Sequence, residues 1–439
     1  MTIVQDCIVS DRPARELDGT AAVADRTRTI RIGLLGLGRV GSAVARHAGV
    51  AGAWRIDVTS ALVRDRQRPR EAGGVAVTSD PEVVFASRPA VVVEALGGLE
   101  PARTLVLEAL ARRIPVVTAN KSLLAHHGDE IFAASIRAGV PVRYEASVIA
   151  GVPFLGTFAG RPHASRLSAI AGIVNGTTNF ILTEMEAGQP DYRAALAEAQ
   201  RRGYAEPDPS KDVSGVDAVE KLAILIRHFG ARRVEPGAIE TTGIEEITAL
   251  DFAHARALGG TIKPIVAVDG LESNTADLTA FSGPAFVPTH HALARLKHTM
   301  NGVTLFDIAG NQLHFTGPGA GPEVTAVTVL DDVIDVATNG QVCAGAGASH
   351  SPVACPRTPW LLRLTHPGTL PPSGDISTTL ADHGVRSSRT SIRTAPGERW
   401  SHAILTHACD RPTIERGAAA VAAATGSIAR AFRAVDGPA

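Results

Sequence analysis

The sequence has few of the residues that mark several classes of protein. Of its 439 residues only 4% are aromatic, and four are cysteine: Cys7, Cys343, Cys355 and Cys409. The cysteines are widely spread, with no CxxC pair and no His/Cys spacing typical of a zinc site. This argues against a structural zinc and favours a reducing, cytoplasmic location.

An excess of charge of either sign is also missing. The formal net charge is -1 and the pI is near 7.0, so the chain lacks the electrostatic footprint of a nucleic-acid or membrane-surface binder. No apolar run approaches the roughly 18 residues of a membrane span. Residues 1–28 mix acidic and basic side chains without the apolar core of a signal peptide. We expect them to form a flexible extension.

What is present is the composition of a globular protein of several domains. The chain is 45% hydrophobic and 20% charged, and its length predicts two to four domains of roughly 100 to 200 residues. From 29 to 145, short apolar strands alternate with helical stretches, which predicts a doubly wound parallel sheet of Rossmann type. We expect a second domain of mixed, α+β type over 146–340. A linker rich in Gly, Ala, Ser and Pro follows over 341–358.

The last segment, 359–439, predicts a small domain. Its pattern is a strand in WLLRLTH, a helix in GDISTTLADHG, two strands, a long helix and a short final strand. This βαββαβ order resembles the ligand-sensing ACT domain.

A glycine-rich turn follows the first predicted strand. In GLGRVG, residues 36–41, Gly36 would make a tight turn, Gly38 would admit a pyrophosphate, and Gly41 would let the next helix pack on the strand. The spacing alone fits a structural turn equally well, whereas a strand before it and a helix after it favour a dinucleotide site. The expected cofactor contacts include the intervening Leu37, Arg39 and Val40.

The end of the second strand distinguishes NADP from NAD. A carboxylate normally binds the ribose hydroxyls of NAD there, but WRIDVTSALV is followed by Arg64 and further arginines. An arginine at this place suits a 2′-phosphate, which favours NADP and leaves NAD possible. The alternative is a solvated basic loop without a ligand.

Five carboxylates and two lysines gather in AQRRGYAEPDPSKDVSGVDAVEK, residues 199–221. Asp217 and Lys221 are four apart, so they share one face of a predicted helix. Such pairs are usually solvated surface ion pairs. The strongly apolar sequence after Lys221 instead suggests that the pair lies at the edge of a core, where a charge pair is a better site candidate.

This segment resembles the signature of homoserine dehydrogenase. The matching positions are Ala199, Gly203, Tyr204, Asp208, Pro209, Asp212, Gly215, Asp217 and Lys221. The resemblance extends to VVVEALGG (91–98), TANKSLLA (118–125), EASVIAGVP (145–153), GIVNGTTNFIL (172–182) and GPGAGPEVTA (317–326), and so covers most of 29–340.

The resemblance implies roles for particular residues. Lys221 would exchange a proton with the carbonyl oxygen, Asp217 would contact substrate and position that lysine, and Glu206 would bind the substrate amino group. Lys121 would be shared by cofactor and substrate. Gly97, Gly203 and Gly321 would line the cofactor and substrate pocket. The chemistry agrees, because reduction of an aldehyde builds negative charge on its oxygen and a positioned ammonium stabilises and protonates that oxygen.

The resemblance also implies a monovalent cation, most often sodium, bound by loop oxygens at Glu145, Val148, Ala150 and Val152. Carbonyl and carboxylate oxygens suit such hard ions. Without the resemblance, EASVIAGVP would be interpreted as an ordinary strand and turn, because backbone ligands leave almost no side-chain pattern.

The resemblance therefore implies an NAD(P)H-dependent reductase that converts L-aspartate 4-semialdehyde to L-homoserine on the way to threonine and methionine, with 146–340 as its substrate-binding, catalytic and dimerisation domain. We expect a homodimer or homotetramer, and an amino-acid effector such as threonine at the C-terminal domain. Two alternatives remain: a non-catalytic sensor, or a reductase of another amino-acid aldehyde. The intact set Lys121, Glu206, Asp217 and Lys221 favours an enzyme.

Overall fold

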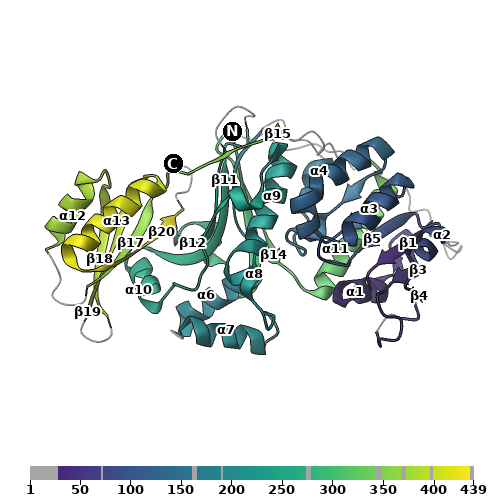
Figure 1. Ribbon diagram of the computed structural model, residues 1–439, viewed down its shortest axis with the longest axis horizontal. Helices are drawn as coiled ribbons and strands as arrows, with labels where there is room; N and C mark the ends of the chain where they lie inside the picture. The colour runs from purple at the N-terminus through teal and green to yellow at the C-terminus, as the bar shows by residue number, and fades with distance from the viewer. Residues whose placement is uncertain are drawn as a thin grey trace, which may run out of the picture.

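The computed structural model describes residues 28–70, 73–160, 166–188, 191–272, 278–342, 349–366, 372–395 and 399–435. These ranges leave out most of the expected N-terminal extension, including Cys7. They also leave out the middle of the expected linker, including Cys343. The molecule is elongated, with three parts in a row (Figure 1). None of the described helices is long and apolar enough to span a membrane.

The first part is a parallel sheet covered by helices. Its strand order is β2 (Val50–Ala51), β3 (Trp54–Leu62), β1 (Arg28–Leu35), β5 (Val91–Glu94), β6 (Val116–Thr118) and β7 (Val142–Arg143), and β4 (Val77–Thr78) pairs with β3. All pairs except β2·β3 are parallel. The connecting helices are α1 (Arg39–His47), α2 (Pro81–Ala86), α3 (Ala102–Ala111) and α4 (Lys121–Ala138). The predicted Rossmann-type fold is confirmed, since buried strands joined by helices form this arrangement.

The middle part is built on an 11-stranded sheet that continues into the C-terminal part. The order is β14 (Gln312–Pro318), β13 (Met300–Asp307), β8 (Leu167–Ile173), β11 (Gly260–Asp269), β12 (Leu278–Pro288), β20 (Ile428–Ala434), β17 (Trp360–His366), β19 (Arg399–Thr406) and β18 (Ser387–Ala395), and β10 (Glu240–Thr241) and β16 (Val353–Ala354) also pair with β12. A separate pair joins β9 (Arg232–Arg233) to β15 (Ser349–His350). The helices of this part are α5 (Leu155–Gly160), α6 (Gly176–Gly188), α7 (Tyr192–Arg201), α8 (Ser210–Val213), α9 (Val216–Gly230) and α10 (Ala249–Ala257).

Helix α9 joins the first and middle parts. Its apolar side packs in one hydrophobic core with residues of α4 and of the sheet, including Leu222, Leu225, Ile131 and Val266. Gly215, with a φ of 89°, starts the helix in the left-handed conformation that glycine adopts without strain. Buried apolar residues on most of its surface place the polar residues Asp217, Glu220 and Lys221 where the helix meets α4.

The chain crosses between these two parts three times. It leaves the first part after β7 through a short helical turn, Glu145–Ser147, and returns through α11 (Pro322–Thr338). After α11 it leads back to β15 and β16, which pair with strands of the middle part. Val329 and Val333 of α11 pack with Ile32 and Val93 of the first sheet. The first two crossings touch: Ala150 N donates to Gly319 O (3.1 Å) and Gly151 N to Pro318 O (3.0 Å). A Cβ on Gly151 would lie 2.4 Å from Pro318 O, so only glycine permits this approach.

The C-terminal part has the predicted βαββαβ order: β17 (Trp360–His366), α12 (Ser373–Asp382), β18 (Ser387–Ala395), β19 (Arg399–Thr406), α13 (Arg411–Thr425) and β20 (Ile428–Ala434). The long helix expected through ARAF is shorter, because Gly426 ends it in the left-handed conformation with a φ of 65°. Strand β20 then pairs with β12, so one sheet continues from the middle part into the C-terminal part.

Candidate active site

Two lysines converge on one carboxylate where α4 meets α9. Lys221 Nζ lies 3.1 Å from Asp217 Oδ2, and Lys121 Nζ lies 3.0 Å from Asp217 Oδ1. Lys121 is the first residue of α4, whereas the other two lie one turn apart on α9. The side chain of Lys121 is 35% exposed and that of Lys221 is 10% exposed. The interpretation of Asp217 and Lys221 as a solvated surface pair is therefore wrong, because both side chains are buried.

The electrostatics keep this cluster charged. Burial alone would raise the pKa of Asp217, but the charges of Lys221 and Lys121 and a hydrogen bond from Asn175 hold it well below its usual value. Burial alone would lower the pKa of Lys121, but the Asp217 carboxylate, with smaller effects of Glu220 and Asp212, raises it. At neutral pH the site therefore presents an ammonium group to the solvent side, held by a carboxylate beneath it.

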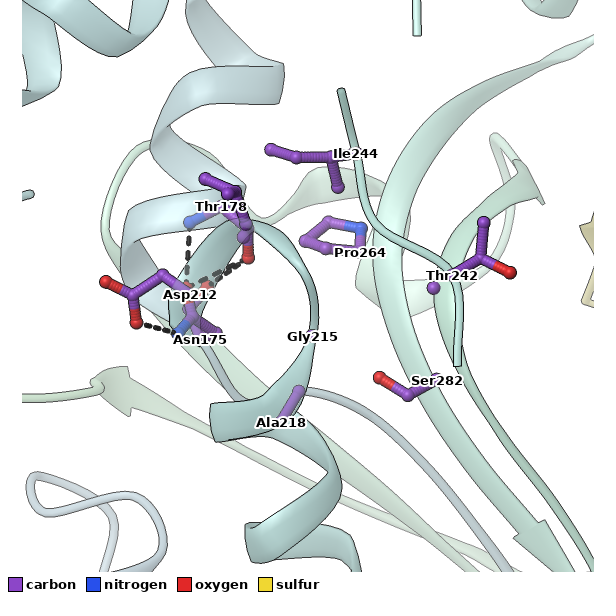
Figure 2. Close-up of a pocket in the computed structure, with 11 residues that line it drawn as sticks. Asn175, Thr178, Asp212, Gly215, Ala218, Thr242, Ile244, Pro264 and Ser282 are labelled. Atoms are coloured by element: carbon purple, nitrogen blue, oxygen red, sulfur yellow. Dashed lines mark hydrogen bonds between the residues drawn. The ribbon is translucent and has the colours of Figure 1, made fainter. Parts of the chain in front are cut away.

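The end of β8 supports the cluster from below. Lys221 Nζ donates a hydrogen bond to Val174 O (2.7 Å). Asn175 Nδ2 donates to Asp217 Oδ2 (2.8 Å) and to Asp212 Oδ1 (2.7 Å), and its Oδ1 accepts from Thr178 N (2.8 Å) at the start of α6. Figure 2 shows Asn175, Asp212 and Thr178 joined in this way on one side of the turn that carries Gly215. NGTTN thus caps a helix and also orients the Asp217 carboxylate.

Asp212 is a site residue that sequence reasoning placed only in a motif. It lies on α8, and burial and the nearby Asp217 raise its pKa, against the hydrogen bond from Asn175 and the two lysines. Asp212 lines a small cavity together with Asn175, Gly215, Ala218, Thr242 and Ser282 (Figure 2). The spacing of five residues between Asp212 and Asp217 does not predict that the two carboxylates lie close together, because α8 ends between them.

Glu206 and Gly203 lie on the exposed loop between α7 and α8. Gly203 has a φ of 74° and no atom within 4 Å of the place where a Cβ would stand. Thr177 Oγ1 donates to Tyr204 O (2.8 Å), which holds this loop over the start of α6. Within the described part of the chain, the Glu206 carboxylate has no hydrogen bond or ion pair. Its expected contact with the substrate amino group stays a prediction.

The glycine-rich turn has the geometry that a dinucleotide needs. Gly36 has a φ of 105°, and a Cβ there would lie 2.6 Å from Ala95 O. A Cβ on Gly41 would lie 2.1 Å from Gly36 O, so α1 packs on β1 only with glycine at this position. Gly38, at the start of α1, faces open space. Leu37 is buried in the core, whereas Arg39 is exposed.

A buried carboxylate ties this region to Lys121. Glu94, at the end of β5, is fully buried and accepts from Leu96 N (2.8 Å), Gly97 N (3.3 Å) and Thr118 Oγ1 (2.6 Å). Asn120 Nδ2 donates to Gly98 O (2.7 Å), and Asn120 Oδ1 accepts from Leu123 N (3.1 Å) to cap α4. The sequence analysis identified both segments, VVVEALGG and TANKSLLA, but did not predict the hydrogen bonds between them.

A second buried amide lies on the other side of the site. Asn301, at the start of β13, is fully buried, and neither its Oδ1 nor its Nδ2 has a partner among the described residues. It packs between Gly176 and Gly319. Gly321, which the sequence assigned to the cofactor, has a φ of 126° and starts α11 just after this contact. Buried amides usually pair, so Asn301 is an exception among the described residues.

The remaining predicted residues are placed as follows. Arg64 follows β3 and is exposed together with Arg66 and Arg68. Glu145 accepts from Phe154 N (2.8 Å), Leu155 N (2.9 Å) and Gly156 N (2.6 Å), so its carboxylate holds its own loop. Val148, Ala150 and Val152 are buried there. No group of three or more His, Cys, Asp or Glu that could hold a metal is found in the described ranges.

Comparison with known proteins agrees with this geometry. A family model described as "Homoserine dehydrogenase, NAD binding domain" matches residues 36–145, and one described as "Homoserine dehydrogenase" matches 153–334. The chain is 38% identical to the homoserine dehydrogenase of Synechocystis over 70% of this chain and 73% of that one, and 35% identical to that of Bacillus subtilis over 71% and 74%.

Solved structures extend the similarity to the C-terminal part. A homoserine dehydrogenase from Thiobacillus denitrificans superposes with a TM-score of 0.83 at 32% identity and covers 94% of this chain and 100% of its own. The converging lysines, the glycine turn and these matches agree, and the chain belongs to the homoserine dehydrogenase family of NAD(P)-dependent oxidoreductases.

Proposed function

We propose that this chain reduces L-aspartate 4-semialdehyde to L-homoserine, with NADPH as the preferred reductant, in the biosynthesis of threonine and methionine. The observation that carries the proposal is the convergence of Lys121 and Lys221 on Asp217. When bound, the nicotinamide supplies the hydride. The Lys221 ammonium stabilises and protonates the oxygen that gains negative charge, while Asp217 holds both lysines in place.

Several features support cofactor binding at the glycine turn. Gly38 leaves open space at the start of α1, where backbone N–H groups favour a phosphate, and Gly97 with a φ of 73° leaves the loop after β5 open as well. The exposed Arg64 stands where a 2′-phosphate would need a cation, and Asp65 is already engaged as an acceptor for Gln67 N (2.8 Å). This supports NADP over NAD.

A monovalent cation, most simply sodium, fits the loop of Glu145, Val148, Ala150 and Val152. Its carbonyl oxygens are hard ligands, and two buried carboxylates lie nearby: Asp332 Oδ2 accepts from Glu145 N (3.0 Å), and burial and the charge of Glu145 raise the pKa of Asp332 well above its usual value. A cation would compensate this negative charge. Replacing sodium by tetramethylammonium at constant ionic strength should lower kcat/KM; an unchanged rate would count against the ion.

The C-terminal part fits a regulatory role, and none of its described residues belongs to the lysine cluster. An amino-acid effector such as threonine, and a dimer or tetramer, are what the resemblance to the family implies. Light scattering, with and without threonine, measures the mass of the particle and any change on binding. A monomer that threonine leaves unaltered, in mass and in activity, would contradict both.

The activity is tested by following NADPH oxidation with L-aspartate 4-semialdehyde. We expect turnover with both cofactors and a higher kcat/KM for NADPH than for NADH. A folded protein that binds NADPH but turns over with neither cofactor would be the sensor that the sequence left open. Turnover with a different amino-acid aldehyde, but not with this one, would identify the specialised reductase.

A further inference from the structure

Helix α9 carries a buried acid that the proposed chemistry does not use. Glu220 lies one turn beyond Asp217 and is only 5% exposed. A buried carboxylate is costly unless hydrogen bonds or charges compensate it. Its contacts therefore indicate what it does.

Those contacts come from the first turns of α4. Ser122 Oγ donates to Glu220 Oε2 (2.7 Å), and His126 Nε2 lies 3.5 Å from Glu220 Oε1. Ser122 and His126 are four apart, so they present one face of α4 to α9. Ser122 directly follows Lys121. The hydrogen bond thus fixes the end of α4 that carries the lysine, from the side opposite to the Asn120 cap.

Glu220 is also part of the charge environment of Lys121. From α9 this lysine faces Asp217 and Glu220, and Lys221 shares the Asp217 carboxylate with it; from α8 it faces Asp212. Burial lowers the pKa of Lys121, and the charge and hydrogen bond of Asp217, with smaller effects of Glu220 and Asp212, more than offset this. Because Asp217 is divided between two ammonium groups, a second negative charge has a clear electrostatic use.

We propose that Glu220 is a positioning residue for the reaction, which holds the first turn of α4 through Ser122 and keeps the Lys121 ammonium charged. His126 closes the network at the surface, where its side chain is 40% exposed. This inference rests on the proposed role of Lys121 at cofactor and substrate. The residues that support the reaction then include the contact between α4 and α9, in addition to the two lysines and Asp217.

The test compares three variants by the pH dependence of kcat/KM for aldehyde reduction. Glu220→Gln removes the charge and keeps an acceptor for Ser122, so the alkaline limb, to which the Lys121 ammonium contributes through substrate and cofactor binding beside the proton donor Lys221, should move down by about one pH unit. Glu220→Asp keeps the charge and should restore most of the wild-type position. Ser122→Ala removes the hydrogen bond and keeps the charge, so its KM should rise while the limb stays in place.

Two results would overturn the inference. One is a Glu220→Gln profile that coincides with that of the wild type. The other is an equal displacement in Ser122→Ala and Glu220→Gln, which would indicate packing alone. Thermal melting and NADPH binding of each variant show whether it is folded. Absence of turnover in the folded wild type would instead contradict the proposed function, so the two failures are distinguishable.

Discussion

Replacement of Lys221 by methionine should lower kcat by about 100-fold or more, the scale expected when a general acid is removed. Methionine keeps much of the length of the side chain and the packing of α9 but has no proton to give. The Asp217 carboxylate would still be paired with Lys121 at 3.0 Å, so the fold should survive. Steady-state rates of NADPH oxidation with L-aspartate 4-semialdehyde measure the loss.

Arginine at the same position separates charge from proton transfer. Its guanidinium stays protonated throughout the accessible pH range, so Lys221→Arg retains the positive charge but cannot serve as the acid. We expect it to recover little of the rate, while NADPH binding, followed by fluorescence, stays near the wild-type value in both variants. A tenfold or smaller fall in kcat for Lys221→Met would contradict the assignment of the proton donor.

Asp217→Asn should have the largest effect on stability. It leaves Lys221 and Lys121 facing one another without the carboxylate between them, and removal of one partner of a buried ion pair costs about 3 kcal/mol at the low end of the usual range. The low end applies because the Lys121 side chain is 35% exposed and partly screened. Chemical denaturation measures the loss. kcat/KM should fall with it, because both lysines lose their orientation.

The pH dependence of the same residue follows from the direction of its shift. The pKa of Asp217 is lower in the folded chain than in the unfolded one, so its contribution is fully present above the unfolded pKa, about 4, and is lost as the pH falls toward the folded value. The acid transition of Asp217→Asn should therefore be shallower than that of the wild type.

Asp208→Asn is the matched control in the same segment. Asp208 is exposed, and its main partner is Ser210 N at 3.1 Å. We expect a far smaller change in the free energy of unfolding than for Asp217→Asn, because a substitution on an exposed surface disturbs no buried charge. Equal destabilisation by Asp217→Asn and Asp208→Asn would mean that the buried ion pairs of Asp217 do not stabilise the fold more than an exposed carboxylate does.

Sequence reasoning predicted those parts of the site that lie close together in the chain. The turn at Gly36, Gly38 and Gly41 follows from strand, spacing and helix, and the shared face of Asp217 and Lys221 follows from helical periodicity. Lys121 was assigned only by resemblance, because its approach to Asp217 depends on the packing of α4 against α9.

The residues that were missed are connected by contacts of long sequence separation. Glu94 joins Asn120 through the sheet order, Asn175 reaches Asp217 from the end of β8, and Ser122 reaches Glu220 across two helices. Composition and periodicity carry no information about such pairs. Asn301 is a different case, because it is recognised only by its burial without a hydrogen-bond partner among the described residues. No sequence pattern predicts the burial of a single amide.

The touching crossings connect the loop proposed to hold a cation with the start of α11. Ala150 N and Gly151 N donate to Gly319 O and Pro318 O, and Gly321 begins α11 two residues after this contact. A displacement of the loop would therefore reach Gly321 through two backbone hydrogen bonds. If an ion fixes this loop, it should also favour one position of Gly321, so that the affinities for ion and cofactor would be thermodynamically linked.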